Sequence, residues 1–177
     1  MRFARPVPAD ELHVVYREHV AAVYAFFAYS VSPDVAEELT ADTFERVVRH
    51  WGRFDASRSS QRTWILAISR NLLTDHFRRR RRRLGPSLDE YPELADSMAS
   101  ADDPAERQAS LETVKGWLSL LNAREREVVA LRYGADLSTG EIARLLDLSE
   151  ANVLQISSRA LRRLKRELSD RELSGNA

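Results

Sequence analysis

The sequence contains no cysteine, and no apolar run has the length of a membrane span. Without cysteine there is no disulfide framework and no thiolate metal site, and a span needs about 20 consecutive apolar residues. The four histidines are scattered, no glycine-rich phosphate loop is present, and the first residues lack the apolar core of a secretion signal. These absences predict a cytoplasmic chain without metal, cofactor, membrane insertion or enzymatic activity.

Charge is segregated along the chain. The 27 basic and 27 acidic residues of the sequence cancel overall. Yet residues 34–45 hold five acidic residues and no basic one, 58–83 hold nine arginines and one acidic residue, and 84–106 hold seven acidic residues and no basic one. Such alternating blocks predict separate surfaces for partners of opposite sign.

The apolar pattern is helical throughout and offers no strand candidate. Apolar residues at steps of three and four predict one helix from Leu12 to Phe27, a second that opens at Ser32-Pro33, and a third from about Thr63 into the arginines. Residues 52–61 break the pattern and predict a loop. The fold class is therefore all-α, with a three-helix domain over 10–83, a flexible acidic linker over 84–105 and a second helical domain over 106–170.

The second domain has the spacing of a helix-turn-helix. Ser138 and Glu141 fit a capping box, and the short turn Asp147–Ser149 separates two helices. The second helix would expose Asn152 and Gln155, which can contact adenine, and arginines that can hold phosphates. An ordinary helical hairpin with a solvated face is the alternative.

The third helix and the loop before it are candidates for single-stranded nucleic acid. Arg70, Asn71, Thr74 and Arg78 lie near one another at helical spacing. The loop over 53–62 is rich in hydroxyls and arginine and could hold an unstacked base. The alternatives are a solvated basic end for the arginine run at 78–83, and a capping or core amide for Asn71.

The second helix carries a row of carboxylates. Four acidic residues at successive spacings of one, four and three share one side of it. The pattern is typical of a solvated face and also fits a docking surface for a basic protein. The row consists of Glu37, Glu38, Asp42 and Glu45.

The segments AEELTADTF (36–44), TWILAISRN (63–71) and DHFRRR (75–80) resemble domain 2 of the extracytoplasmic-function (ECF) sigma factors of bacterial RNA polymerase. Residues 121–153 and 159–168 resemble domain 4 of the same family. The resemblance covers about 12–83 and 107–168.

The resemblance implies that the acidic row docks on the β′ coiled coil of core RNA polymerase, that the linker approaches the RNA exit channel, and that the second domain contacts the β flap. Promoter DNA would be the other partner, and an anti-sigma factor or another regulatory protein a further one. The implied contacts with the melted minus-ten strand are Arg53, Asp55, Ser57, Arg58, Arg62, Arg70, Asn71, Thr74, Arg78, Arg79 and Arg80. Those with the minus-thirty-five element are Ser149, Glu150, Asn152, Leu154, Gln155, Ser158, Arg159 and Arg162.

The sequence departs from the family pattern in the second domain. Asp147 stands where the family usually has glycine, so a less relaxed turn is expected. Leu154 and Ile156 stand at positions of Lys and Arg, and Ser157 stands at a leucine core position. These departures predict a weakened minus-thirty-five readout, helped by another protein.

Two other functions remain open from the sequence. Residues 121–153 also resemble the DNA-binding domain of LuxR-type activators, in which case the first domain would be a sensor or dimerisation domain. The second alternative is a sigma-like adaptor that binds polymerase without initiating transcription.

Overall fold

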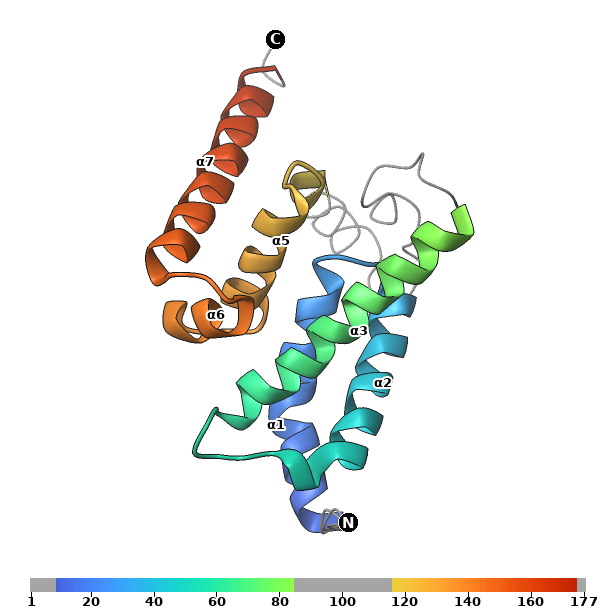
Figure 1. The fold of residues 1–177 in the computed structure, drawn as a ribbon. Helices are drawn as coiled ribbons and strands as arrows, with labels where there is room; N and C mark the ends of the chain where they lie inside the picture. Colours follow the sequence, from blue (N-terminus) through green and yellow to red (C-terminus); the bar gives the residue numbers. More distant parts are fainter. Residues whose placement is uncertain (1–8, 85–115, 175–177) are drawn as a thin grey trace.

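The computed structural model describes residues 9–84 and 116–174, which form helices and contain no strand. Helices α1 to α3 form the first unit, and the elements from α5 onward form the second (Figure 1). The bounds are α1 Ala9–Ala28, α2 Pro33–His50, 3₁₀-helix η1 Trp51–Arg53, α3 Gln61–Leu84, α5 Ala123–Val129, π-helix η3 Ala130–Gly134, α6 Thr139–Leu146 and α7 Glu150–Ser174.

The three helices of the first unit pack around large apolar side chains that the periodicity predicted. Val15, Phe26, Val47 and Ile65 are among those that are almost fully buried. Helix α2 begins as expected, with Ser32 in extended conformation and Pro33 in the first turn. Each of these helices thus follows the ordinary rule that one apolar stripe faces the core.

The loop before α3 is shorter than predicted. Residues 51–53 form η1, and α3 starts at Gln61 rather than about Thr63. The Ser60 hydroxyl accepts a hydrogen bond from the Thr63 amide at 3.2 Å, as an N-cap residue does. Ser60 is thus the start signal that the apolar pattern did not contain.

The second unit contains the predicted helix-turn-helix, formed by α6 and α7. Ser138 and Glu141 make the predicted capping box. A second capping box, between Asn122 and Glu125, opens α5. The turn passes through Asp147, whose φ of 54° lies in the left-handed region.

A buried arginine holds the start of the second unit in place. Arg126 is 3% exposed. Its Nε and Nη2 atoms donate to the Leu118 carbonyl at 3.0 and 2.8 Å, and Nη2 also donates to the Leu121 carbonyl at 3.0 Å. The guanidinium therefore satisfies backbone acceptors of the turn that precedes α5.

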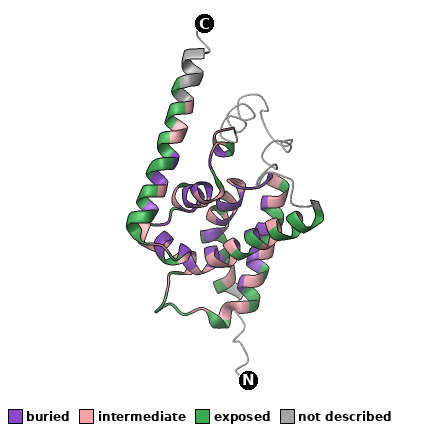
Figure 2. Cartoon of the chain, turned by 45° about the horizontal axis from the view of Figure 1, so that its top comes forward, coloured by how far each residue is buried: buried purple, intermediate pink, exposed green. Residues whose placement is uncertain are grey.

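The two units share one hydrophobic core. It runs from Phe27 and Leu66 in the first unit to Leu131 and Ile142 in the second. η3 packs against α1, and α6 packs against α3, so α5 and α6 lie between α7 and the first three helices (Figure 1). Buried residues accordingly gather where the helices meet, while the last turns of α3 are mostly exposed (Figure 2).

The predicted linker over 84–105 lies outside the described residues except for Leu84, and so do residues 106–115 of the predicted second domain. Sequence reasoning expected two separately tethered modules and did not foresee the shared core. Among the described residues, no helix is long and apolar enough to cross a membrane.

Candidate nucleic-acid interface

The arginine run continues α3 as a helix to Leu84. Five of its six arginines are exposed, and Arg80 is half-buried. Arg78 lies 3.5 Å from Asp75, the one carboxylate nearby in sequence. The guanidinium groups therefore surround the helix end, as consecutive residues on a helix must, and form a dense positive surface.

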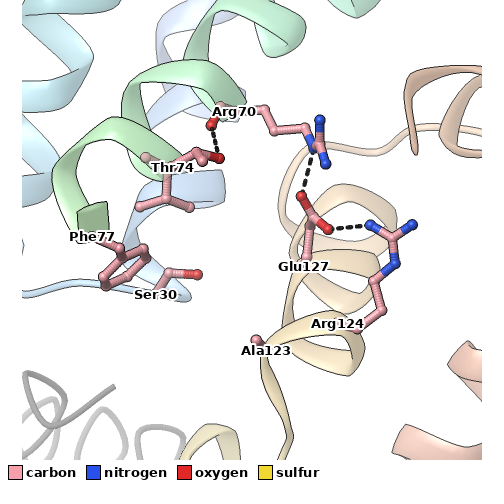
Figure 3. Close-up of a pocket in the computed structure, with 8 residues that line it drawn as sticks. Ser30, Arg70, Thr74, Phe77, Ala123, Arg124 and Glu127 are labelled. Atoms are coloured by element: carbon pink, nitrogen blue, oxygen red, sulfur yellow. Dashed lines mark hydrogen bonds and ion pairs between the residues drawn. The ribbon is translucent and has the colours of Figure 1, made fainter. Parts of the chain in front are cut away.

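The middle of α3 exposes two polar residues and also carries an arginine that is hydrogen-bonded to the second unit. Asn71 and Thr74 are exposed. The Thr74 hydroxyl donates to the Arg70 carbonyl one turn earlier, at 2.9 Å. The Arg70 side chain points away from Thr74 and donates from Nε to Glu127 Oε1 at 2.7 Å (Figure 3).

The loop over 53–62 has a defined turn at its centre. The amide and the hydroxyl of Ser57 both donate to Asp55 Oδ1, at 2.9 and 2.7 Å. These two hydrogen bonds, together with nearby Arg58, lower the pKa of the exposed Asp55 carboxyl.

Three aromatic rings fix the loop to α3. Trp51, Phe54 and Trp64 pack ring against ring at 5.4–6.0 Å. Trp64 thus serves the packing. Arg53 and Arg58 are exposed on the loop.

The acidic row lies on α2. Glu37, Glu38 and Glu45 are exposed and Asp42 is half-buried. Glu45 forms an ion pair with Arg49 one turn later. The row is therefore accessible to another molecule along most of its length.

The recognition helix α7 exposes the predicted groove-facing residues. Leu154 is 53% exposed, and the Ser149 hydroxyl accepts from the Asn152 amide at 3.2 Å, capping the helix. The other predicted contacts on the helix, Glu150, Gln155, Ser158, Arg159 and Arg162, are also exposed.

Two of the departures on α7 face the protein rather than solvent. Ile156 is half-buried and packs against the shared core. Ser157 is buried, in line with a core position. Leu154 therefore lies on the exposed face, where the loss of a basic contact is predicted, whereas Ile156 does not lie on that face.

Three acidic residues of the second unit contact the first unit, and these contacts were not predicted from the sequence. Glu127 accepts from Arg70 and also from Arg124 Nη1, at 2.6 Å (Figure 3). Asp136 and Glu141 face the start of α3. Their partners in the first unit lie far away in the sequence, so no local pattern pointed to them.

The Glu141 carboxyl is the most extensively hydrogen-bonded of these groups. Partial burial raises its pKa. Hydrogen bonds from Ser138, Thr63 and Ser60 outweigh that effect, and the net pKa is lowered. The carboxylate therefore stays charged at neutral pH. Among the described residues, no group of three or more histidine or acidic side chains could hold a metal ion.

The match with known families covers both units. The model for Sigma-70 region 2 matches residues 15–83, and the model for Sigma-70, region 4 matches residues 117–166. The two helical units therefore define a protein of the sigma-70 class, with one unit for each of these regions.

Similar proteins place the chain more narrowly. The ECF RNA polymerase sigma factor BldN of Streptomyces coelicolor is 31% identical over 163 residues, which are 92% of this chain and 62% of that protein. SigM of Bacillus subtilis, also an ECF sigma factor, is 29% identical over 153 residues, 85% of this chain and 91% of SigM.

A solved structure of the sigma factor RpoE in complex with the anti-sigma factor NepR, from Bartonella quintana, has a TM-score of 0.69 at 25% identity and covers 90% of this chain and 95% of that one. The chain belongs to the ECF sigma factor family. The residue roles predicted above are not tested by these similarities and stay predictions.

Proposed function

We propose that this chain binds bacterial core RNA polymerase in the cytoplasm, directs it to particular promoters and helps to open the minus-ten element, with no catalytic step of its own. The observation that carries the proposal is the distribution of charge on the first unit. Helix α2 exposes a row of carboxylates, and α3, which packs against it, exposes arginines. One surface suits a basic protein and the other suits a polyanion.

The polymerase contact is proposed at the acidic row. Glu37, Glu38, Asp42 and Glu45 would meet the basic β′ coiled coil. Exposed charges at an interface raise the association rate and set the orientation of the partner more than they add affinity. Docking at this row should therefore weaken strongly as ionic strength rises.

Strand opening is proposed to be driven by binding. Breaking the duplex costs about 1.4 kcal/mol of stacking per base-pair step, and flipping a base costs a few kcal/mol more. The sequence has no phosphate-binding loop for nucleotide hydrolysis. The energy must come from capture of the separated strand by the loop over 53–62 and by side chains of α3, namely Asn71, Thr74 and Arg78–Arg80.

The second unit is proposed to contact duplex DNA through α7 and the β flap through an apolar surface. Asn152 and Gln155 are exposed near the start of α7, where a recognition helix approaches base edges. Arg159 and Arg162 follow at positions suited to phosphates. Leu154 can contact a thymine methyl group. An anti-sigma protein is a further proposed partner, supported by the similarity to a sigma factor that was solved with one.

The proposal is tested by reconstitution. The purified chain is combined with core RNA polymerase and a library of promoter fragments, and run-off transcripts are sequenced. The expected result is a set of transcripts with a shared minus-ten motif that are absent without the chain. Glu37→Lys with Glu38→Lys should abolish them. A matched variant on α1, Glu11→Lys with Glu18→Lys, makes the same charge change at exposed positions and should not.

Other outcomes identify the alternatives. Binding to polymerase without any promoter-dependent transcript would mark a non-initiating adaptor and overturn the initiation role. Tight specific binding to duplex DNA without polymerase would favour a regulator of the LuxR type, although the match of residues 15–83 to sigma-70 region 2 argues against that class.

A further inference from the structure

Two arginines of the first unit are held by carboxylates of the second. Arg70 Nε lies 2.7 Å from Glu127 Oε1, and both side chains are partly shielded from solvent, with exposed fractions of 33% and 20%. Arg62 Nη1 lies 3.5 Å from Asp136 Oδ2 in a more exposed position. The Arg70–Glu127 pair is therefore the stronger of the two, because exposed pairs are weakened by solvent and salt.

Two hydroxyl groups at the start of α3 donate to a third carboxylate. Ser60 Oγ and Thr63 Oγ1 lie 3.2 and 3.0 Å from Glu141 Oε1. In these bonds, as in the two arginine pairs, the donor belongs to the first unit and the acceptor is a carboxylate of the second. The contact between the units is thus a surface of donors facing a surface of negative acceptors.

The donors are also groups that the proposed function requires. Arg62 and Arg70 are proposed to hold the minus-ten strand, and Ser60 belongs to the loop proposed to receive a base. A DNA strand presents negative oxygens that accept hydrogen bonds from arginines and hydroxyls. Carboxylates offer negative charge and acceptor oxygens of the same kind, so they can occupy these donors in place of phosphates.

The carboxylates engage only some of the proposed strand-binding groups and leave the others open. The engaged groups are Ser60, Arg62, Thr63 and Arg70, while Asn71, Thr74 and Arg78 on α3 are exposed, as are Arg53 and Arg58 on the loop. Beside Arg70 a cavity of about 280 Å³ opens between the units, lined by Thr74, Phe77, Arg124 and Glu127 among others (Figure 3). A strand that binds the exposed end of α3 must compete with the carboxylates for Arg62 and Arg70.

We propose that Glu127, Asp136 and Glu141 act as an internal substitute for DNA phosphates and keep the isolated chain from capturing single-stranded DNA. This inference rests on the proposed function. Separation of the two units, as when each docks on its own part of the polymerase, releases Arg62 and Arg70 for the strand. The groove-facing residues of α7 are exposed in the same arrangement, so the block falls on strand capture and not on contact with duplex DNA.

The test compares two triple variants of the full chain. The first variant replaces three carboxylates by amides of nearly the same shape: Glu127→Gln, Asp136→Asn and Glu141→Gln. The matched control, Glu11→Gln, Asp34→Asn and Glu167→Gln, makes the same change in net charge away from the contact between the units. The probe is a fluorescein-labelled 20-nucleotide single strand of random sequence, followed by anisotropy. The first variant should bind about tenfold more tightly than the parent, the order expected for the loss of two partly exposed ion pairs and of the hydroxyl hydrogen bonds to Glu141, and the control should stay within about twofold of the parent.

Equal affinity of the two triple variants would overturn the inference, because net charge alone would then explain any gain. Since Glu141 also caps α6, the double variant Glu127→Gln with Asp136→Asn repeats the test with that cap intact and should retain most of the gain. Run-off transcription with the parent chain and core polymerase is measured in parallel. Absence of transcripts there overturns the proposed function, whereas transcripts without a gain in strand affinity overturn only the inference.

Discussion

Gly134 of the second unit lies against the ring of Tyr29 in the first. A β-carbon added at Gly134 would lie 3.1 Å from Tyr29 Cε2 and 3.4 Å from the carbonyl carbon of Ala25. Tyr29 packs at the edge of the shared core and also against the smaller apolar cluster of the second unit. The two units therefore approach at a place where a hydrogen is the only side chain that fits without adjustment.

We expect Gly134→Ala to lower the free energy of unfolding by about 1–3 kcal/mol, the usual cost of overpacking a well-filled site. The matched control is Gly140→Ala in α6. There the added carbon would meet only the Glu150 carboxylate, at 3.2 Å, and alanine is the better helix former by up to about 1 kcal/mol. Urea unfolding followed by circular dichroism should thus shift in opposite directions for the two variants. A Gly134→Ala protein at least as stable as its parent would contradict the close approach.

Arg126→Met should destabilise the second unit by about 3 kcal/mol. The change leaves the Leu118 and Leu121 carbonyls without the charged donor that now satisfies them, and hydrogen bonds to charged groups contribute about 1.5–3 kcal/mol each. Amide hydrogen exchange should show the loss first around residues 118–131. Arg144→Met, at an exposed position of α6, should change stability by no more than about 0.5 kcal/mol. Similar losses in both variants would mean that the buried guanidinium has no special role.

Asp147→Gly should stabilise the protein by roughly 0.5–1 kcal/mol. Asp147 has a φ of 54°, and this left-handed conformation is free of steric cost only for glycine. Asp147→Ala is the informative comparison, because alanine carries the same β-carbon without a polar side chain that can hydrogen-bond the local backbone. The order of stability measured by thermal unfolding should be glycine, aspartate, alanine. Any other order would indicate that the turn is held by something other than its backbone conformation.

Stability should fall on mild acidification, in part through His19. Burial lowers the pKa of His19 below its usual 6.5, and nearby Arg62 adds to the lowering, while Gln61 and Glu18 oppose it. The unfolded chain therefore takes up the proton before the folded one does. The stability that depends on an uncharged His19 is complete above about pH 6.5. It is lost as the pH falls through the lower pKa of His19 in the folded state.

Urea unfolding at pH 7.5 and at pH 5.5 measures this effect. The parent should lose more stability between the two values than a His19→Gln variant, which has no imidazole to protonate. An equal loss of stability in the two proteins would mean that His76 is responsible instead of His19. The pKa of His76 is also lowered, first by burial and then by Arg80.

Local features of the fold could be predicted from the sequence because their causes are local. Ser138 and Glu141 form a capping box from residues three apart, and Ser32-Pro33 opens α2 by the same kind of short-range rule. The exposed positions of α7 follow from its periodicity in the same way. The start of α3 was misplaced by two residues because its cap, Ser60, is not part of any apolar pattern.

Contacts between the units could not be predicted in this way. Arg70 and Glu127 are 57 residues apart in sequence, and Ser60 and Glu141 are 81 apart. Helical periodicity indicates which side of a helix is buried, and it does not indicate which partner covers that side. Arg126 was missed for a related reason, since its pattern of charge is that of an exposed helix position and only the carbonyls around it explain its burial.

The shared core has a consequence for how the two units come apart. Because Phe27, Leu66, Leu131 and Ile142 belong to one apolar cluster, separation of the two units exposes apolar side chains to water and also breaks ion pairs. Added salt screens the charges but does nothing to favour the exposure of apolar side chains to water. Ionic strength alone should therefore leave the protein closed, and only a partner that offers fresh apolar contact in exchange can hold it open.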